Sequence, residues 1–149
     1  MKLSSGVDML HFITVLIAVP DGAFRQTLHR SLTEAGSFRV VGLADSMEAG
    51  LAQTAALQPD VVLLATTLLN GSSQKAAEAG LFSTSKVLLV SEPGQEAGLL
   101  TTLQLGARGY LIRDEALLTK LPDAICAVQR GEAILSPRLA GWMLDTILH

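Results

Sequence analysis

The amino-acid sequence predicts an α/β domain with a doubly wound, five-stranded parallel sheet, and two observations support this prediction. Residues 58–67 contain the apolar run Val61-Val62-Leu63-Leu64 directly after a Pro-Asp start, a pattern typical of a strand buried on both faces of a parallel sheet. Similar β-branched runs recur along the chain and alternate with segments of helical periodicity. Such alternation indicates a parallel sheet covered by helices.

The first half of the chain supplies two strands and two helices. Residues 12–19 form an apolar run that ends at the turn signal Pro20-Asp21-Gly22, which predicts the first strand. Residues 23–35 repeat apolar side chains at four-residue spacing, and Gly36 follows as the expected C-cap of a helix. Residues 38–43 predict the second strand. Ser46 is expected to cap a helix that ends before Pro59 and turns three side chains inward, namely Leu51, Thr54 and Leu57.

After the central strand, the sequence predicts a loop over residues 70–73 and a short helix over 74–79. Residues 86–91 predict the fourth strand, residues 95–105 a helix, and residues 110–113 the fifth strand after the helix-breaking stretch 106–109. Thr119 is expected to cap a helix reaching Arg130, with Pro122 in its first turn. Ser136-Pro137 is expected to open a sixth helix that runs through residue 148.

Length and composition indicate one domain. The chain has 149 residues, of which 49% are hydrophobic, enough for a full core. We expect a flexible leader over residues 1–12, the domain over 13–131, and a linker or dimerisation helix over 132–149.

The net charge of −3 is unsuited to holding nucleic acid through phosphate contacts, so DNA binding would require another domain. Cys126 is the single cysteine, which excludes an internal disulfide and indicates a cytoplasmic protein. No apolar run approaches the length of about 18–20 residues that crosses a membrane.

Five segments together resemble a known family. In chain order they are residues 13–18, 59–64, 86–91, 106–114 (Gly-Ala-Arg-Gly-Tyr-Leu-Ile-Arg-Asp) and 127–137. They resemble the CheY-like receiver domain of two-component response regulators, and the Gly-Ala-Arg-Gly-Tyr-Leu element resembles the NarL/LuxR-type subfamily. The resemblance implies a flavodoxin-like sheet of order 2-1-3-4-5 and a role in phosphorelay signalling and transcription regulation.

The resemblance also implies a set of functional positions, which this sequence fills unusually. The acidic pair that holds Mg²⁺ in the family falls at Val19 and Pro20, and the phosphoacceptor aspartate falls at Ala65. The remaining switch positions are Ser91, Tyr110 and, in place of a lysine, Arg113. Phosphoryl transfer needs a nucleophilic carboxylate and a divalent cation, so we expect neither phosphorylation nor Mg²⁺ binding, and no catalysis and no cofactor.

Other residues that could carry chemistry have ordinary structural explanations. Asp21, Asp45 and Asp60 suit a turn, a helix entrance and a strand start better than a metal site. The three histidines, at positions 11, 29 and 149, lie far apart in the sequence. Cys126 has no neighbouring histidine and is expected to be a small core residue. Residues 70–73 lack the lysine of a phosphate-binding loop, and Ser91 lacks a base at a recognisable spacing.

Arg113 is the substitution that could introduce a new function. An arginine in place of a phosphate-sensing lysine could exchange a switch for a fixed bidentate contact. The alternative is an ordinary solvated ion pair with Asp21 or Asp114, which would contribute little.

The sequence therefore predicts a pseudo-receiver, meaning a receiver-like regulatory module that acts through protein–protein contacts without phosphorylation. We expect it to be the N-terminal part of a DNA-binding response regulator. Two alternatives remain: a stand-alone receiver-like adaptor without an output domain, or a flavodoxin-like binder of a small ligand that uses the loops at residues 65–73 and 91–94.

The expected sixth helix predicts self-association. Residues 138–148 contain two charged side chains among eleven, which is too apolar for a helix that covers its own domain with one stripe. One interpretation is that this helix packs back on its own domain. The other is a homodimer interface, or a contact with a downstream domain, with candidate residues Leu139, Trp142, Met143, Ile147 and Leu148.

Overall fold

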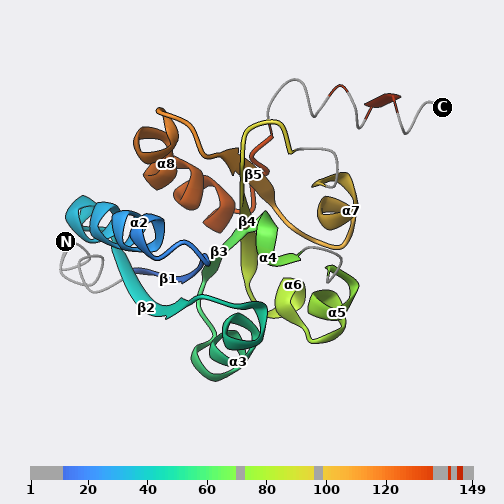
Figure 1. Cartoon of the computed structure of the whole chain (residues 1–149), viewed down its shortest axis with the longest axis horizontal. Coiled ribbons are helices and arrows are strands. Elements are labelled where there is room, and N and C mark those ends of the chain that lie inside the picture. The colour runs from blue at the N-terminus through green and yellow to red at the C-terminus, as the bar shows by residue number, and fades with distance from the viewer. Residues whose placement is uncertain (1–11, 70–72, 96–98, 136–140, 142–143, 146–149) are drawn as a thin grey trace, which may run out of the picture.

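A computed structural model describes residues 12–69, 73–95, 99–135, 141 and 144–145 (Figure 1). Five parallel strands form one sheet of order β2-β1-β3-β4-β5, which confirms the predicted fold class and strand order. The strands are β1 (Ile13–Ala18), β2 (Phe38–Ala44), β3 (Val61–Ala65), β4 (Lys86–Ser91) and β5 (Gly109–Ile112). The helices are α2 (Gly22–Ala35), α3 (Met47–Leu57), α4 (Thr66–Leu69), α5 (Ser73–Glu78), α6 (Leu81–Thr84), α7 (Leu99–Gln104) and α8 (Leu117–Gln129).

Strand β3 lies in the middle of the sheet and is buried along its whole length. All five of its residues are buried, and it pairs with β1 on one side and β4 on the other. This confirms the prediction that residues 61–65 form a strand covered on both faces.

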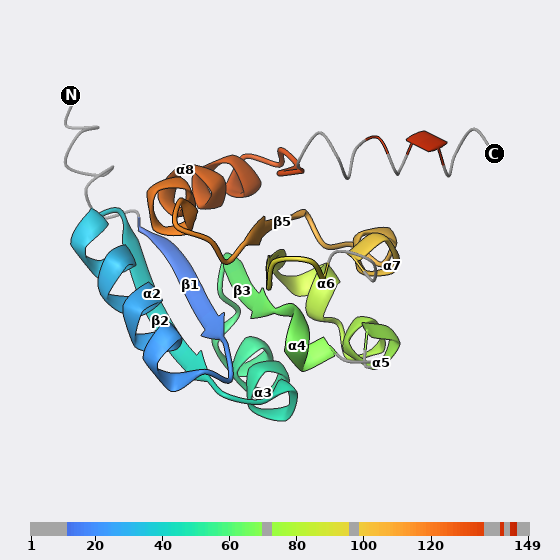
Figure 2. The same cartoon turned by 45° about the horizontal axis from the view of Figure 1, so that its top comes forward.

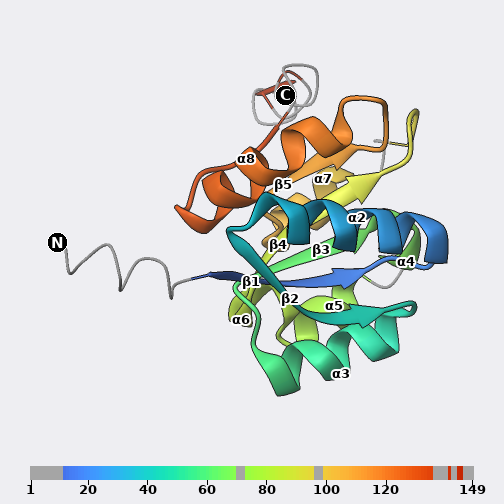
Figure 3. The same ribbon diagram turned by 90° about the vertical axis from the view of Figure 1, so that its left-hand side faces the viewer.

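Helices cover both faces of the sheet, so that two apolar layers form. Alternate strand residues such as Val15 and Leu63 face α2 and α8, while their neighbours Leu16 and Leu64 face the layer that contains α6 and α7. Figure 3 shows α2 and α8 on one face, with α3 and α5 on the other. The strand ends are therefore held between two packed layers, which fixes the side chains that follow each strand.

Helix α2 has the expected C-terminus and a well-defined N-cap. The Asp21 carboxylate accepts a hydrogen bond from the Phe24 N–H at 3.1 Å, which satisfies one of the free donors in the first turn. Gly36 ends the helix with φ at +83°, a left-handed conformation that glycine adopts without steric cost.

Helix α3 begins as predicted but turns its last residue outward. The Ser46 hydroxyl accepts a hydrogen bond from the Ala49 N–H at 3.1 Å, as expected for an N-cap. Thr54 is buried and Leu51 packs against the core, whereas Leu57 is 47% exposed. The prediction for Leu57 was wrong, because the helix ends at this residue and the chain turns through Gln58 in a left-handed conformation.

The segment after β3 contains more helix than predicted. Helix α4 starts immediately after Ala65, as Figure 2 shows, where no helix was expected. Residue 73, expected in a loop, begins α5 instead, and a separate short helix, α6, follows Gly80. Residues 70–72 lie outside the described part of the chain. Helices of four to six residues are too short to give a periodic sequence signal, which explains why the pattern did not predict them.

Strand β4 has the predicted bounds, and β5 begins and ends one residue earlier than predicted. Helix α7 covers residues 99–104 of the predicted 95–105, and residues 96–98 are outside the described part.

Helix α8 begins earlier than predicted. Thr119 is not its N-cap, because the helix starts at Leu117 after Ala116 and has no side-chain cap on that residue. The Asp114 carboxylate accepts from the Ala116 N–H at 3.0 Å just before the helix, and burial of Leu117, Leu121 and Ile125 at four-residue spacing favours the earlier start. Pro122 consequently lies inside the helix rather than in its first turn.

A short segment after α8 extends the sheet at the β5 edge. Ile134 accepts a hydrogen bond from the Tyr110 N–H at 2.9 Å and donates one to the Arg108 carbonyl at 3.1 Å. This close approach requires a glycine, because a Cβ atom on Gly109 would lie 2.7 Å from the Ile134 nitrogen. The Gly-Ala-Arg-Gly-Tyr-Leu element therefore has a packing reason for its second glycine.

In the expected sixth helix, three residues belong to the described part of the chain. Gly141, Leu144 and Asp145 have helical backbone and are exposed; the rest of the segment lies outside it. Among the helices described, none is both long enough and apolar enough to cross a membrane.

Candidate functional site at the carboxyl edge of the sheet

The carboxyl ends of the parallel strands meet at one edge of the sheet, where open α/β folds usually place their functional groups. We call this region the carboxyl edge and define it by residues 19–21, 65, 91–92 and 113. It includes the predicted site residues except Tyr110 and those of the sixth helix. The structure thus brings together side chains that are nearly one hundred positions apart.

The end of β1 offers backbone oxygens instead of carboxylates. Val19 is buried in the apolar layer beneath α2, and Pro20 is exposed. Arg25, on α2, donates a hydrogen bond from Nη1 to the Val19 carbonyl at 2.7 Å and a longer one to the Pro20 carbonyl at 3.4 Å. A guanidinium group therefore occupies the carbonyl oxygens at this strand end with hydrogen bonds.

The end of β3 carries no group that could react. Ala65 is 7% exposed, and its methyl group belongs to the same apolar layer as Val19, Phe24 and Val90. A methyl group has no lone pair with which to attack a phosphoryl group.

The end of β4 carries a hydroxyl group that is bound within its own loop. Ser91 is fully buried, and its Oγ donates towards the Glu92 carbonyl at 3.2 Å and the Gln95 carbonyl at 3.4 Å. The hydroxyl is thus engaged by the backbone that leads from β4 towards α7.

Arg113 follows β5 and contacts side chains from two other strand ends. Its Nη2 lies 3.1 Å from Asp21 Oδ2, and its Nη1 lies 3.4 Å from Glu92 Oε2. The guanidinium carbon lies 3.9 Å from the centre of the Phe24 ring, within the range of a cation–π contact. The expected pairing with Asp21 forms, but the guanidinium shares its nitrogens between two carboxylates rather than binding one of them in a bidentate manner.

The hydrogen bond from the Phe24 N–H and, next in importance, the contact with Arg113 hold the pKa of Asp21 below its ordinary value of 3.8. Both partners stabilise the charged form of the carboxylate. Asp21 therefore remains ionised at neutral pH and is held by the Phe24 N–H and by Arg113. The sequence predicted a turn at this position but not the hydrogen bond from the Phe24 N–H.

Tyr110 lies away from this cluster. It is buried on the opposite face of the sheet, in the apolar layer with Leu89 and Leu99. A hollow of about 280 Å³ lies along β5 beside Tyr110, between the start of α8 and Leu135. The lining of that hollow includes neither Ala65 nor Ser91, the residues that begin the two loops of the predicted ligand-binding alternative.

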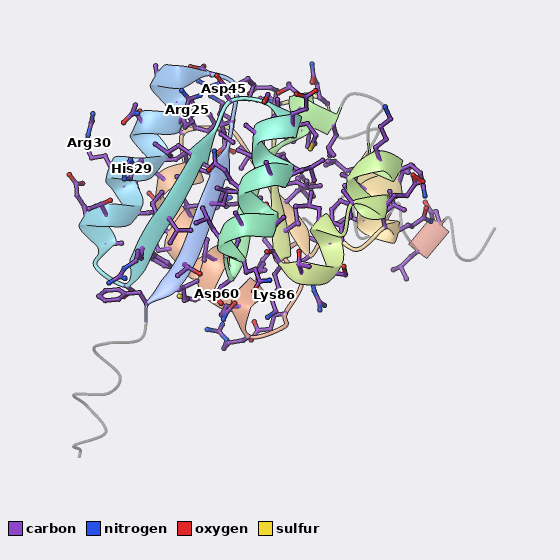
Figure 4. The ribbon with its side chains drawn as sticks, turned by 90° about the horizontal axis from the view of Figure 1, so that it is seen from below. Arg25, His29, Arg30, Asp45, Asp60 and Lys86 are labelled. Carbon is purple, nitrogen blue, oxygen red and sulfur yellow. The ribbon has the colours of Figure 1, made fainter. Side chains whose placement is uncertain are left out.

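The aspartates considered as metal ligands are separated by the fold. Figure 4 shows Asp45 and Arg25 at one end of the molecule and Asp60 and Lys86 at the other. Asp60 accepts a hydrogen bond from the Thr14 N–H at 2.9 Å, at the amino end of β1.

The side chains at the carboxyl edge do not fit Mg²⁺. Within the described ranges, no group of three or more His, Cys, Asp or Glu side chains could hold a metal ion. Mg²⁺ requires near-octahedral oxygen coordination and usually one or two carboxylates, whereas Asp21 and Glu92 are bound by Arg113 and the β1 carbonyls by Arg25.

Sequence reasoning missed Arg25, Phe24 and Glu92. A signal existed for Glu92, which follows the last residue of β4, and for Arg25, which lies in the first turn of the helix after β1. The structure also places Cys126 half-buried against the core. The candidate interface residues Leu139, Trp142, Met143, Ile147 and Leu148 lie outside the described part of the chain.

Comparisons with known proteins agree with this architecture, although no family model matches the chain. The probable transcriptional regulatory protein NarL of Mycobacterium tuberculosis is 31% identical over 137 residues, which cover 91% of this chain and 63% of that protein. The response regulator GacA of Pseudomonas syringae is 32% identical over 130 residues, covering 86% of this chain and 60% of that protein. The chain spans about three fifths of the length of these curated relatives.

Solved structures of response regulators share the fold of this chain. The signal receiver domain of NarL from Mycobacterium tuberculosis is 31% identical, with a TM-score of 0.72 over 82% of this chain and 99% of that domain. A LuxR-family response regulator from Aurantimonas shares the fold at 18% identity, with a TM-score of 0.77 over 93% of this chain and 99% of the other.

The chain belongs to the receiver domains of two-component response regulators. Within that class, its relatives place it with the NarL type.

Proposed function

We propose that this domain is a pseudo-receiver, which regulates its partners through protein contacts and is not phosphorylated. The observation that carries the proposal is that Val19, Pro20 and Ala65 stand at the three carboxylate positions of the family, while guanidinium groups engage the oxygens that remain at the carboxyl edge. Ala65 provides no nucleophile, while Arg25 and Arg113 bind the backbone and side-chain oxygens that surround the ends of β1 and β4. Positive charge is thus already present where a receiver would require a metal ion for phosphoryl transfer.

The domain would act as the N-terminal regulatory part of a longer transcription regulator. The relatives extend well beyond the region that matches this chain, which supports the proposal that DNA is bound by a separate output domain. The negative net charge of the chain agrees with this division, since a DNA-contacting domain requires a positive surface.

We further propose that the domain forms a homodimer without phosphorylation, with the segment 138–148 contributing to the interface. Leu144, within that segment, is 59% exposed, and an exposed apolar side chain in an apolar stretch favours burial against another surface. The distantly similar response regulator RcsB has been solved as dimers bound to DNA.

The response to a phosphoryl mimic tests the proposal. Amide NMR spectra of the domain would be recorded with Mg²⁺ alone and with Mg²⁺ and beryllofluoride. The spectra are expected to be superimposable, because no carboxylate at position 65 is present to bind the mimic. The RcsB receiver domain from Salmonella, whose structure was solved in the presence of BeF₃⁻, provides the positive control. Saturable shifts around residues 65 and 91 would contradict the proposal.

A further inference from the structure

Arg113 joins three separate segments of the carboxyl edge. We call Arg113 and its three partners, Asp21, Phe24 and Glu92, the Arg113 cluster. Asp21 and Phe24 belong to the start of α2, and Glu92 belongs to the loop between β4 and α7. A single guanidinium group thus connects the beginning of α2, the end of β4 and the end of β5.

Three members of the cluster are held in place by other contacts. Asp21 is fixed by the hydrogen bond from the Phe24 N–H, and the Phe24 ring is buried in the core. The Arg113 backbone is fixed to β4, because its N–H donates to the Ser91 carbonyl at 2.8 Å. The Phe24 ring and Asp21 therefore orient the guanidinium group independently of Glu92.

Glu92 is the member that lies on an exposed loop. Residues 93–95 are exposed, and the loop is closed by a hydrogen bond from the Gln95 N–H to the Glu92 carbonyl at 3.2 Å. The Ser91 hydroxyl lies within hydrogen-bond distance of the Glu92 carbonyl at 3.2 Å and of the Gln95 carbonyl at 3.4 Å. A contact between Arg113 and the Glu92 carboxylate consequently restrains the whole turn over residues 91–95.

The geometry distinguishes this arrangement from an ordinary surface ion pair. The side chains are 36%, 44% and 41% exposed for Arg113, Asp21 and Glu92, so each pair alone would be weak. Two carboxylates on different segments meet one planar group that lies over an aromatic ring, and this combination suits an arginine. A lysine ammonium group could still donate to both carboxylates, but it has no planar face to place against the ring.

We propose that Arg113 is a positioning residue that holds the described part of the β4–α7 loop, residues 92–95, in one conformation by anchoring Glu92 to the start of α2. This inference rests on the proposed function, and it adds a mechanism of regulation: the loop is held by a built-in cation rather than by a phosphoryl group. The surface that the loop presents to a partner is then constant, and signalling depends on the availability of the partner or on the amount of the domain.

Amide hydrogen exchange at Gln95 tests the inference. Arg113→Met removes the cation, and Glu92→Gln removes the charge of the loop carboxylate alone. Both variants are expected to accelerate exchange of the Gln95 amide by about fivefold or more, because the turn opens locally. The double variant is expected to exchange no faster than Arg113→Met, since both changes remove the same contact. Arg113→Lys should lie between wild type and Arg113→Met.

A matched control is available elsewhere on the surface. Arg130 pairs with Glu132 at 2.9 Å, with both side chains more exposed than those of the Arg113 cluster. Arg130→Met should leave Gln95 exchange unchanged. Unchanged exchange in Arg113→Met and Glu92→Gln, or additive effects in the double variant, would overturn the inference.

The same samples separate this inference from the proposed function. A wild-type domain that responds to Mg²⁺ and beryllofluoride would refute the pseudo-receiver proposal and, with it, the regulatory role given to Arg113. A wild-type domain that does not respond, combined with unchanged Gln95 exchange in the variants, would refute the role of Arg113 alone.

Discussion

Replacing Ala65 with aspartate would return a carboxyl group to the end of β3 without rebuilding a receiver site. Ala65 is 7% exposed and belongs to the same apolar layer as Val19, Phe24 and Val90. The described cations of the site are already engaged, Arg113 by two carboxylates and Arg25 by the Val19 carbonyl. The introduced group would therefore be buried among apolar side chains with poor hydrogen bonding, and we expect a loss of about 1–3 kcal/mol in the free energy of unfolding.

The matched control is Ala65→Asn, which has nearly the same size and no charge. Burial raises the pKa of the introduced carboxyl group above its unfolded value. The extra penalty of Ala65→Asp over Ala65→Asn is then absent in acid, below the unfolded pKa of about 4, grows as the pH rises from there to the folded pKa, and is constant above it. Urea denaturation of the three proteins between acid and neutral pH measures this difference.

Calorimetry of the same variant measures whether a metal site has returned. We expect no Mg²⁺ binding in the millimolar range, because Val19 and Pro20 still provide no carboxylate. An Ala65→Asp variant as stable as wild type at neutral pH, or one that binds Mg²⁺, would refute the reasoning about this edge of the sheet.

Three further predictions concern other parts of the molecule. The pKa of the Asp21 carboxyl group should lie below its ordinary value of 3.8 in a carbon NMR titration, so its stabilising effect is present at neutral pH and is lost as the pH falls through that lowered pKa. In Arg113→Met this pKa should rise but stay below 3.8, because the hydrogen bond from the Phe24 N–H remains. A pKa of Asp21 unchanged by Arg113→Met would exclude the contact with Arg113 in solution. Gly109→Ala should lower the free energy of unfolding by about 2–4 kcal/mol, since its Cβ would collide with the Ile134 backbone. Gly22→Ala, whose Cβ would meet the flexible end of the Arg25 side chain at an ordinary contact distance of 3.6 Å, is the control that should leave the free energy of unfolding nearly unchanged in the same denaturation experiment. In analytical ultracentrifugation at tens of micromolar, residues 1–149 should form dimers and residues 1–135, which keep the Ile134 contact with β5, should be monomeric; a monomer in the first case or an undiminished dimer in the second would remove the segment 138–148 from the interface.

The strands were predictable because their sequence signal is strong and local. Val61–Ala65 and Lys86–Ser91 are apolar runs bounded by turn residues, and the structure places both strands where the pattern indicated. Helix caps with a serine hydroxyl or a glycine were equally clear, as Ser46 and Gly36 show. The start of α8 was not predictable in the same way, because Asp114 accepts the hydrogen bond from the Ala116 N–H from outside the helix. The position of Thr119 two residues after the true start favoured the wrong N-cap.

The candidate site was predictable in its position and only partly in its contacts. Strand order brings the ends of β1, β3, β4 and β5 to one edge, so Ala65, Ser91 and Arg113 could be expected there from the sequence. The stacking of Arg113 on Phe24 and its contact with Glu92 depend on the rotation of α2 and on the course of the β4–α7 loop. Neither feature is encoded in a local pattern, because both result from packing between segments distant in the chain.

The most direct test of the central claim is incubation of the wild-type domain with Mg²⁺ and acetyl phosphate, followed by measurement of its intact mass. We predict an unchanged mass, because the end of β3 carries a methyl group in place of a nucleophile and guanidinium groups bind the surrounding oxygens. Stoichiometric addition of one phosphoryl group to an aspartate of the domain would contradict the pseudo-receiver account.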